Sequence, residues 1–485
     1  MLNHRPVYEN GHFVPTFVPG RPPMPGNFIT LRTAALMPSI ARNPLTGFAE
    51  VNFQEPVSVY SLFGKPFALI NDPALIRHIF IERSDTLVKE QLSQKILRYA
   101  LRDGMLTAEG EVWRKARRAI APMFSPRHVA GFGGAMVRTT ERFVEELRAG
   151  PERIDLAPAM SKLAFLILSE TLFSGEINSE GEQILADTAI FLEKLGQPDP
   201  LDLMNAPDWL PRVTRMRGHS SSGRLRTIVR NAAEARRDAM GRGESVPDDF
   251  LTSLLRAGED ERTRLTLDEI EDNVLTFVAA GHETTARAVT WTLYCLAHDP
   301  ESLERAQAEV DALDTALPAR EWGKRLPWTT ACFEEAMRLF PPAAVIIREL
   351  REDVDFNGYH IEKGRNAYIS QWVLHRHRAL WEEPDAFVPA RMFGEARAKV
   401  DRFAYLPFGL GPRVCIGASF AMQEAAVMLA QLLRAFDFTY AGLEMPKPVM
   451  RITVQPDNGM PMRLAERRDE RAGTEQAAAS LVASA

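Results

Sequence analysis

A single cysteine, Cys415, stands in a glycine-rich stretch that runs from Phe408 to Gly417 and is followed by an apolar helical pattern. Glycines this dense before a helix suit a backbone that turns tightly and approaches a large flat group. Unpaired N–H groups at a helix start favour a thiolate, which is a soft ligand for iron. Arg413 is a permanent cation suited to a carboxylate. The stretch therefore predicts a thiolate ligand for iron or, as the plainer alternative, a tight turn with a buried structural cysteine.

A second stretch that could do chemistry lies in the middle of a predicted long helix, residues 266–297. Thr266 and Glu269 are spaced as a capping box at its start. Its middle, 280–285, reads Ala-Gly-His-Glu-Thr-Thr, although glycine inside a helix costs about 1 kcal/mol relative to alanine. Poor helix formers in this place indicate a functional distortion. The alternative is an ordinary buried helix with a kink, in which the Thr284 hydroxyl bonds to the carbonyl one turn earlier.

Two further pairs have helical spacing. Trp113 and Arg117 lie four residues apart, and Glu335 and Arg338 lie three apart, so each pair shares one helix face. By itself the first pair is more often a core tryptophan beside a solvated arginine. The second is more often a surface ion pair worth a few tenths of a kcal/mol. Neither pair predicts a site without further context.

His375 and His377 are two residues apart on a possible strand, which is a spacing that can chelate a metal. Their neighbourhood contains Trp381 and Pro384, so packing and hydrogen bonding are the favoured interpretation.

Taken together, these stretches resemble the cytochrome P450 superfamily. Its haem-binding loop has the pattern Phe-x-x-Gly-x-Arg-x-Cys-x-Gly, and every fixed position is filled between Phe408 and Gly417. The resemblance runs from about residue 30 to 464, with the motifs in family order. It implies haem b as the cofactor and Cys415 as the axial iron ligand. The family's haem-contacting positions correspond to Trp113, Arg117, Ala280, Arg348, Phe408, Gly409, Arg413 and Gly417.

The resemblance also assigns roles to the middle of the long helix. Glu283 and Thr284 match the acid–alcohol pair that relays protons, and Ala280 belongs to the small residues that leave room for the porphyrin. His282 is expected to face away from the iron. The same resemblance implies a substrate pocket lined by Phe277, Val278, Ala344, Val345, Ile346 and Met460, beside Ala280. The turn at 455–461 resembles the C-terminal hairpin whose tip enters that pocket.

A buried charged triad is a further expectation from the family. Glu335 and Arg338 match its Glu-x-x-Arg helix, and Arg391 matches the third member. The family usually has glutamate where Ala390 stands, so this position departs from the pattern. The triad is expected to fix the core near the haem rather than to take part in chemistry.

Composition narrows the class of protein. The chain has 485 residues, of which 45% are hydrophobic and 25% charged, as in ordinary globular proteins. A net charge of −6 without a long basic run argues against nucleic acid as a partner. Three cysteines fit a reducing cytosol better than a disulfide framework. The first residues contain no apolar run long enough for a signal peptide or membrane span. We therefore expect a cytoplasmic protein of the soluble bacterial type, without a membrane anchor.

The expected fold is mainly α with a small β-rich portion, the cytochrome P450 fold. We expect an extended proline-rich segment over 1–30, one haem-thiolate domain over 31–464 and a disordered tail over 465–485. By its place in the order, 182–242 should hold the mobile pair of helices that covers the substrate pocket.

The function implied is that of a haem-thiolate monooxygenase, which activates O2 and hydroxylates or epoxidises an apolar small molecule. Electrons are expected from a separate ferredoxin-type donor with its reductase, because little sequence follows the haem loop. The donor should dock near Arg114, Lys115 and Arg118. Two alternatives stay open. A peroxide-driven peroxygenase would be expected to lack the acid–alcohol pair, and a haem-thiolate sensor would need neither that pair nor a pocket.

Overall fold

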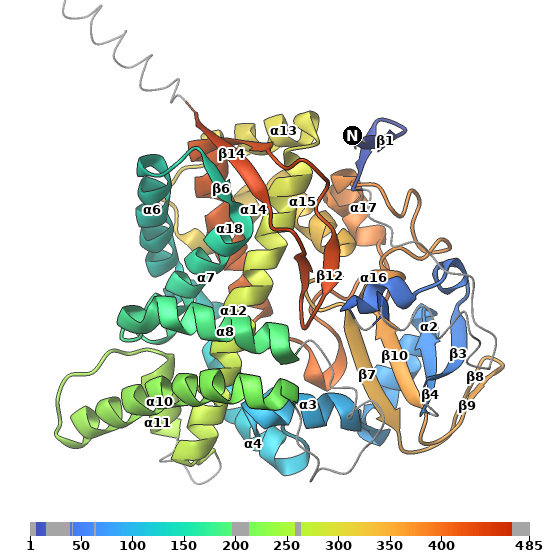
Figure 1. The fold of residues 1–485 in the computed structure, drawn as a ribbon, viewed down its shortest axis with the longest axis horizontal. Helices are drawn as coiled ribbons and strands as arrows, with labels where there is room; N and C mark the ends of the chain where they lie inside the picture. Colours follow the sequence, from blue (N-terminus) through green and yellow to red (C-terminus); the bar gives the residue numbers. More distant parts are fainter. Residues whose placement is uncertain are drawn as a thin grey trace, which may run out of the picture.

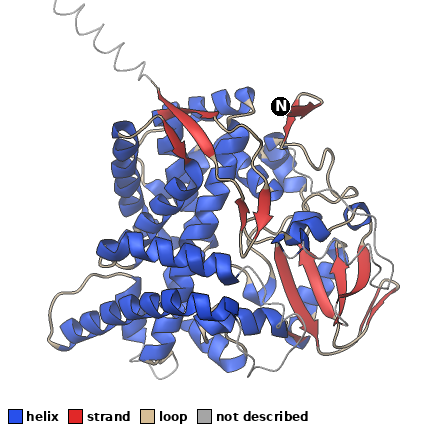
Figure 2. Ribbon diagram, viewed as in Figure 1, coloured by secondary structure: helices blue, strands red, loops and turns tan. Residues whose placement is uncertain are grey.

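The computed structural model describes residues 6–15, 39–40, 42–62, 65–195, 213–257 and 263–467. Figures 1 and 2 show two parts, a large helical part and a smaller sheet beside it. This arrangement confirms the expected mainly α architecture with a small β-rich portion. Most of the segment 1–30, the connection 196–212 between the two expected lid helices and nearly all of the tail 465–485 lie outside the described residues. Within the described part, no helix combines the length and apolarity that crossing a membrane requires.

The helical part surrounds one long helix, α12 (Leu267–Leu296), which runs through the middle of the view in Figure 1. The other described α-helices are α2 (Pro73–Arg77), α3 (Gln91–Leu101), α4 (Gly110–Ile120), α5 (Pro126–Gly131), α6 (Gly133–Ala149), α7 (Leu156–Leu172), α8 (Gly181–Leu195), α10 (Val213–Gly241), α11 (Phe250–Ala257), α13 (Pro300–Ala312), α14 (Ala319–Arg325), α15 (Pro327–Leu339), α16 (Gln371–Leu374), α17 (Gly394–Lys399) and α18 (Ala418–Ala435).

The predicted capping box begins α12. The Thr266 N–H donates to Glu269 Oε2 at 2.7 Å, and the Glu269 N–H donates to Thr266 Oγ1 at 3.2 Å. From Ile270 onward most side chains of α12 are buried, against α7, α15 and α18. A helix buried on all sides must be apolar around most of its circumference, as this one is. The prediction of one long helix here is confirmed.

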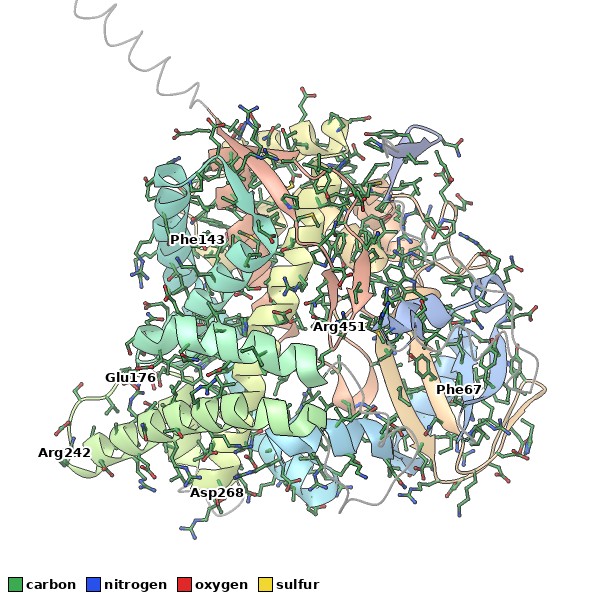
Figure 3. The ribbon with its side chains drawn as sticks, in the orientation of Figure 1. Phe67, Phe143, Glu176, Arg242, Asp268 and Arg451 are labelled. Carbon is green, nitrogen blue, oxygen red and sulfur yellow. The ribbon has the colours of Figure 1, made fainter. Side chains whose placement is uncertain are left out.

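Ion pairs join α10 to the first half of α12. Arg226 Nη1 lies 2.6 Å from Glu271 Oε1 and 2.8 Å from Asp272 Oδ1. Arg230 reaches Glu271 and also Asp268, which Figure 3 labels. Both Glu271 and Asp272 are buried, so removing their partners would leave uncompensated charge in the core. These contacts set the place of α10, which with α8 forms the expected pair of helices.

The five-stranded sheet has the strand order β3–β4–β10–β7–β5. Only β4 and β10 are parallel, and the other neighbours are antiparallel. Register places Lys89 of β5 opposite Arg348 of β7, so two cations meet at the edge of the sheet. The strands of this sheet are β3 (Val57–Leu62), β4 (Lys65–Ile70), β5 (Leu87–Lys89), β7 (Val345–Leu350) and β10 (Asn366–Ser370).

Smaller sheets complete the fold. β14 (Pro461–Glu466) lies between β11 (Phe436–Tyr440) and β6 (Arg153–Asp155). Three hairpins stand alone: β1 (Val7–Glu9) with β2 (His12–Val14), β8 (Val354–Phe356) with β9 (Tyr359–Ile361), and β12 (Pro448–Met450) with β13 (Val454–Pro456).

The C-terminal hairpin differs from the expectation for 455–461. Its two strands are β12 and β13, and its tip is formed by residues 451–453. The Asn458–Gly459 turn does exist, with Gly459 at φ +74°, but it joins β13 to β14, which belong to different sheets. The turn residues were therefore identified correctly, and the strands that they connect were not. An Asn-Gly pair indicates a tight turn but does not specify which strands pair beyond it.

Candidate functional site

The loop that carries Cys415 needs glycine at two positions. Gly409 and Gly411 have φ values of +72° and +68°, which side chains disfavour. A Cβ on Gly411 would lie 2.6 Å from the Phe80 carbonyl oxygen, so a side chain there would collide with backbone. The Cys415 N–H donates to the Phe408 carbonyl at 2.8 Å and closes the loop. The glycine spacing therefore shapes the loop that presents the thiol.

The Cys415 thiol is exposed, yet burial raises its pKa above the ordinary value. The exposure and the raised pKa are consistent with each other if the exposed part of the thiol faces a confined space within the protein. The N–H of Gly417 and the charge of Arg117 act in the opposite direction but are weaker. The expectation that the helix start alone favours the thiolate is therefore too simple, because α18 begins only at Ala418. A metal cation that displaces the proton would supply the missing stabilisation.

Arg413 links the cysteine loop to the start of α4. Its Nη1 donates to the Ala108 carbonyl at 2.8 Å, and its Nη2 donates to Glu109 Oε1 at 3.0 Å. The guanidinium carbon lies 3.9 Å from the centre of the Trp113 ring, as in a cation–π contact. One turn later on α4, Arg117 Nη1 donates to the Val414 carbonyl at 3.1 Å. The predicted pair on α4 thus meets the loop at two points.

Four cations gather beside this loop. Burial, together with nearby positive charges, lowers the pKa of Lys89 to about 7 and that of Arg413 to about 10. Burial also lowers the pKa values of Arg117 and Arg348. Among the described residues, Glu109 is the one carboxylate that contributes to this group, and its Oε1 lies 3.8 Å from Lys89 Nζ. Arg348 has no carboxylate partner among the described residues; its Nη1 donates to the Ile347 carbonyl.

Sequence reasoning found three of these four cations and missed Lys89. It lies in a three-residue strand without a motif, and only its register opposite Arg348 brings it to the site. An excess of about three positive charges over carboxylates is unfavourable in partly buried surroundings unless anions bind there.

The middle of α12 interrupts an otherwise buried helix. Ala280 is exposed and Ala279, Gly281 and Thr284 are half-buried, although the stretches 270–278 and 288–296 of the helix are buried. The Thr284 hydroxyl donates to the Ala280 carbonyl at 3.0 Å, which is the back-bond of the plainer alternative. Because that bond uses the hydroxyl hydrogen, the oxygen keeps its lone pairs for accepting another bond. The exposed surface of Ala280 marks the place where a flat group could lie against the helix.

Gly281 serves packing rather than room for a cofactor. A Cβ at this position would lie 2.3 Å from Leu168 Cδ1 of α7, so the missing side chain allows the two helices to approach closely. His282 points to the same side of α12, with its ring edge-on to Phe165 and Nδ1 2.6 Å from the Val278 carbonyl. Burial lowers its pKa. Its orientation agrees with the expectation that His282 does not face the iron.

Glu283 is buried and held by two elements. Arg287 Nε donates to Glu283 Oε1 at 2.8 Å, and Thr453 Oγ1 donates to the same oxygen at 3.3 Å. Thr453 belongs to the tip of the β12–β13 hairpin. The predicted acid therefore has partners that sequence reasoning did not identify, one on its own helix and one about 170 residues away.

Glu335, Arg338 and Arg391 meet in the core as a triad. Arg338 Nε and Nη2 each donate to one oxygen of Glu335 at 2.8 Å, and Arg391 Nε donates to Glu335 Oε1 at 3.0 Å. The side chains of Glu335 and Arg338 have no exposed surface. Ala390 faces solvent, so the departure at that position leaves the triad complete.

The histidine pair does not form a metal site. His375 Nε2 accepts from the Leu406 N–H at 2.9 Å, and His377 Nε2 lies 3.2 Å from the Glu55 carbonyl. Burial lowers the pKa of His375 to about 3, so its ring is neutral. No cluster of three or more potential metal ligands occurs among the described residues. Packing and hydrogen bonding account for both side chains.

The expected pocket residues fall into two groups by exposure. Val345 and Ile346 are half-buried, whereas the other four are buried. Phe277 stacks on Phe124 with ring centres 5.0 Å apart. The half-buried Ile452, at the tip of the β12–β13 hairpin, is a candidate that sequence reasoning missed. The buried four are Phe277, Val278, Ala344 and Met460.

Glu424 is a further titratable group that sequence reasoning missed. It lies on α18 without exposed surface, and burial raises the pKa of its carboxyl to about 8. The carboxyl faces Thr285 of α12, which acts to lower the pKa, although neither oxygen has a hydrogen-bond partner of ordinary geometry within the described part of the chain. A neutral carboxyl thus lies under the long helix at pH 7. A lone acid within the apolar pattern after Cys415 was the available signal.

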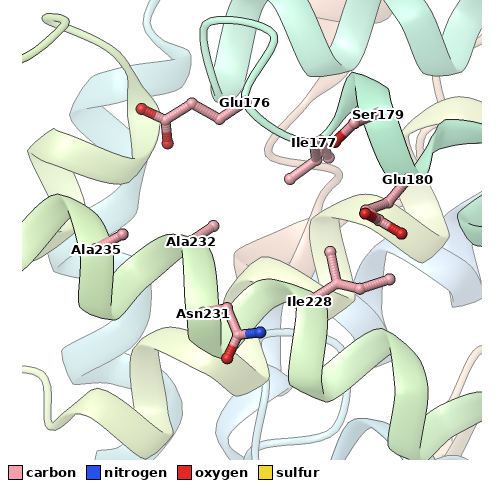
Figure 4. A pocket seen from close by; sticks show the side chains of 8 residues that line it. All are labelled: Glu176, Ile177, Ser179, Glu180, Ile228, Asn231, Ala232 and Ala235. Atoms are coloured by element: carbon pink, nitrogen blue, oxygen red, sulfur yellow. The ribbon is translucent and has the colours of Figure 1, made fainter.

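A surface hollow elsewhere holds none of these residues. It lies between α10 and the segment before α8, with Glu176, Glu180 and Asn231 on its rim, as Figure 4 shows. Glu176 is already paired with Arg236 at 2.6 Å. The chemistry-bearing residues lie around the cysteine loop and α12 instead.

The residues around Cys415 fit a haem. The exposed surfaces of Ala280 and Cys415 provide a place for a flat group, and the four cations suit its two propionate carboxylates. A soft thiolate suits its iron.

Comparisons with known proteins agree with this fit. The family model described as cytochrome P450 matches residues 22–461. Cytochrome P450 97B2, chloroplastic, of Glycine max is 31% identical over 483 residues, covering 86% of this chain and 82% of that protein. Carotene epsilon-monooxygenase, chloroplastic, of Arabidopsis thaliana is 27% identical, covering 84% and 80%. The crystal structure of the cytochrome P450DA heme domain superposes with a TM-score of 0.75 at 26% identity, covering 86% of this chain and 91% of that one.

Proposed function

This chain belongs to the cytochrome P450 family, and from that premise we propose that it oxidises an apolar small molecule with electrons from a separate ferredoxin-type donor. It is a haem-thiolate monooxygenase, an oxidoreductase with the cytochrome P450 fold and haem b as its cofactor. Bound haem supplies the activation of O2. The proposed parts are the substrate class, the donor, the single domain over 31–464 and the cytoplasmic location expected from the sequence.

The residues that would hold the cofactor follow from the contacts. Cys415 would bind the iron, Ala280 would lie against the ring, and the cations Lys89, Arg117, Arg348 and Arg413 would bind the propionates beside Trp113. Phe408, Gly409 and Gly417 shape the loop. Arg348 carries the argument for an anionic ligand, because burial disfavours its charge, no described carboxylate pairs with it, and the charge of Glu109 compensates the burial only in part. The half-buried Val345, Ile346 and Ile452 support an apolar substrate.

The hydrogen bonds of Glu283 and Thr284 favour a monooxygenase over a peroxygenase. Both side chains are fixed by neighbours, which an acid–alcohol relay requires and a peroxide-driven enzyme does not. Peroxide-driven turnover without any donor, equal to turnover with one, would support the peroxygenase. Failure of every apolar compound to shift the Soret band would support a sensor.

The Thr284→Ala variant tests the relay. Thr284 would hold a water through its free lone pairs and pass a proton at that place. Without the hydroxyl, donor oxidation should continue at a comparable rate, while product per donor should fall roughly tenfold, which is less than the 10²–10⁴-fold contribution of a complete general acid–base step. Hydrogen peroxide should rise to match the loss. Product, peroxide and donor are measured in the same assay.

Thr284→Ser is the matched control, because it restores the hydroxyl and should recover much of the coupling. Thr290→Ser provides a second control on the same helix, since Thr290 bonds to the Ala286 carbonyl away from the site. Full coupling in Thr284→Ala would place the relay on another group, such as Thr285.

The donor surface is proposed around Arg118 on α4. Of the three expected cations, Arg114 is paired with Glu111 and Lys115 with Glu269, at 2.8 Å in the second case. Arg118 is exposed and has no carboxylate partner among the described residues. Val112 of the same helix is exposed, and so is Val414, whose carbonyl accepts a hydrogen bond from the neighbouring Arg117. A cation with apolar neighbours beside the haem loop suits an acidic partner.

Charge reversal tests this surface. Arg118→Glu should slow reduction by the donor at least about threefold at low salt, because exposed charges guide association within about 10 Å at 0.1 M salt. Raising the salt concentration should shrink the difference between variant and wild type. Stopped-flow reduction measures both effects. Lys363→Glu, on the turn before β10, is the control and should behave as wild type. Equal rates in Arg118→Glu at every salt concentration would move the docking surface elsewhere.

A further inference from the structure

Arg287 contacts Glu283 in an asymmetric way. It lies one turn after the acid on α12, with Nε 2.8 Å and Nη2 2.7 Å from the same oxygen, Oε1. Thr453 donates its hydroxyl hydrogen to Oε1 as well, at 3.3 Å. A bidentate pair would place one nitrogen on each oxygen, as Arg338 does with Glu335. Here all donors converge on one oxygen.

The other oxygen of Glu283, Oε2, accepts no hydrogen bond from the described residues. The known partners of the carboxylate are Arg287 and Thr453, and both use Oε1. Oε2 is not one of the side-chain oxygen and nitrogen atoms that lack both exposed surface and a hydrogen-bond partner. It therefore keeps some accessible surface, through which water can reach it.

The same arginine also reaches the C-terminal hairpin. Arg287 Nη2 donates to Gln455 Oε1 at 3.4 Å, and Trp291 Nε1 donates to the Val454 carbonyl at 3.3 Å. With Thr453, these bonds hold the β12–β13 hairpin against α12. In Figure 1 the hairpin lies between α12 and β7, and Figure 3 labels Arg451 at its tip. Arg287 thus fixes Glu283 relative to both elements.

We infer that Arg287 is a positioning residue of the proton relay, which holds Glu283 by Oε1 so that Oε2 alone exchanges protons. This inference rests on the proposed role of Glu283. Oε2 would take one proton from solvent water and pass it to the water held by Thr284, so the carboxylate is restored in each cycle. An anchored Oε1 prevents rotation of the carboxylate. If the carboxylate could rotate, either oxygen could take up the proton and release it in a different direction. Both partners are ionised in the Arg287–Glu283 pair, and two arginine nitrogens lie closer to Oε1 than the Thr453 hydroxyl does, so the arginine contributes more than Thr453.

The test compares Arg287→Met, Glu283→Gln and the double variant. Loss of the arginine should slow the proton-dependent step about tenfold and enlarge its solvent isotope effect, measured as decay of the oxygenated enzyme in H2O and D2O. The double variant should be no slower than Glu283→Gln, because Arg287 acts only through the acid. Arg287→Lys should restore part of the rate. Arg230→Met is the control, because it removes an arginine that pairs with acids at the other end of α12. It should leave the solvent isotope effect unchanged.

A second readout does not depend on activity. In the resting enzyme, the infrared carboxylate bands assigned by difference against Glu283→Gln should shift in Arg287→Met and, less, in Thr453→Val. If the double variant is slowed by the product of the two single effects, Arg287 acts through the fold and the inference is wrong. If Glu283→Gln itself matches wild type, the relay proposal fails. Unshifted bands in Arg287→Met would overturn the positioning role alone.

Discussion

Replacing Cys415 by alanine is expected to abolish the red-shifted Soret band of the reduced carbon monoxide complex together with all monooxygenation. That band reports a thiolate bound to the iron, and the thiolate's electron density favours cleavage of O2. Cys415 is the one exposed cysteine of three; Cys295 and Cys332 are buried. Both other thiols have no exposed surface, and burial holds their pKa values well above the ordinary value, so neither is accessible to a metal ion. The loss should therefore be complete.

Two variants make this result specific. Cys332→Ala removes a thiol of the core and should keep the band, although the cavity that it leaves lowers stability. Cys415→His should bind haem with a band at the position typical of nitrogen ligation and should remain inactive. Haem content measured by the pyridine haemochrome separates loss of the ligand from loss of the cofactor. An unchanged band in Cys415→Ala would mean that another residue binds the iron.

Local patterns in the sequence were sufficient for the elements that depend on neighbours in the chain. The capping box of Thr266 and Glu269 depends only on residues within one turn. The glycine spacing around Cys415 also encodes its own loop, because the left-handed φ values belong to Gly409 and Gly411 themselves. Such features can be predicted from spacing because the interacting groups are close in sequence.

Residues that act through distant contacts were not predictable in this way. Lys89 reaches the site through strand register, and Thr453 reaches Glu283 from about 170 residues away. The packing role of Gly281 depends on Leu168 of another helix. The triad was expected only because the family has one, since Glu335 and Arg391 are 56 residues apart. A sequence without an alignment carries no local signal for which distant segments pack together.

Breaking the triad is expected to have the second largest effect. Arg338 has no exposed surface, and besides Glu335 it donates to the carbonyls of His375, Pro384 and Ala386, at 2.7, 2.6 and 2.8 Å. One arginine thus joins α15 to the segment that precedes the haem loop. Burying charges is costly, so the pair adds little net stability while both partners are present. Removing one partner leaves the other charge buried and uncompensated.

Glu335→Gln should therefore lower the free energy of unfolding by about 3–5 kcal/mol, because two arginines lose their shared anion. Arg338→Met should cost a similar amount for a different reason. Arg391 and the Val388 N–H, at 3.0 and 2.9 Å, still compensate Glu335, but three buried carbonyls lose their donor, at about 1–3 kcal/mol each before relaxation. Denaturant midpoints followed by tryptophan fluorescence measure both losses, and haem content should fall with them.

The adjacent pair provides the matched control. Glu334 and Arg397 lie 3.1 Å apart beside the triad, but the arginine is about a third exposed. Partly solvated pairs contribute about 0–1 kcal/mol, so Arg397→Met should shift the midpoint only slightly. The difference between the two pairs isolates burial as the cause, since both join a glutamate of α15 to an arginine of the 391–397 segment. If Glu335→Gln were as stable as Arg397→Met, the core around the haem loop would have to be held by apolar packing alone.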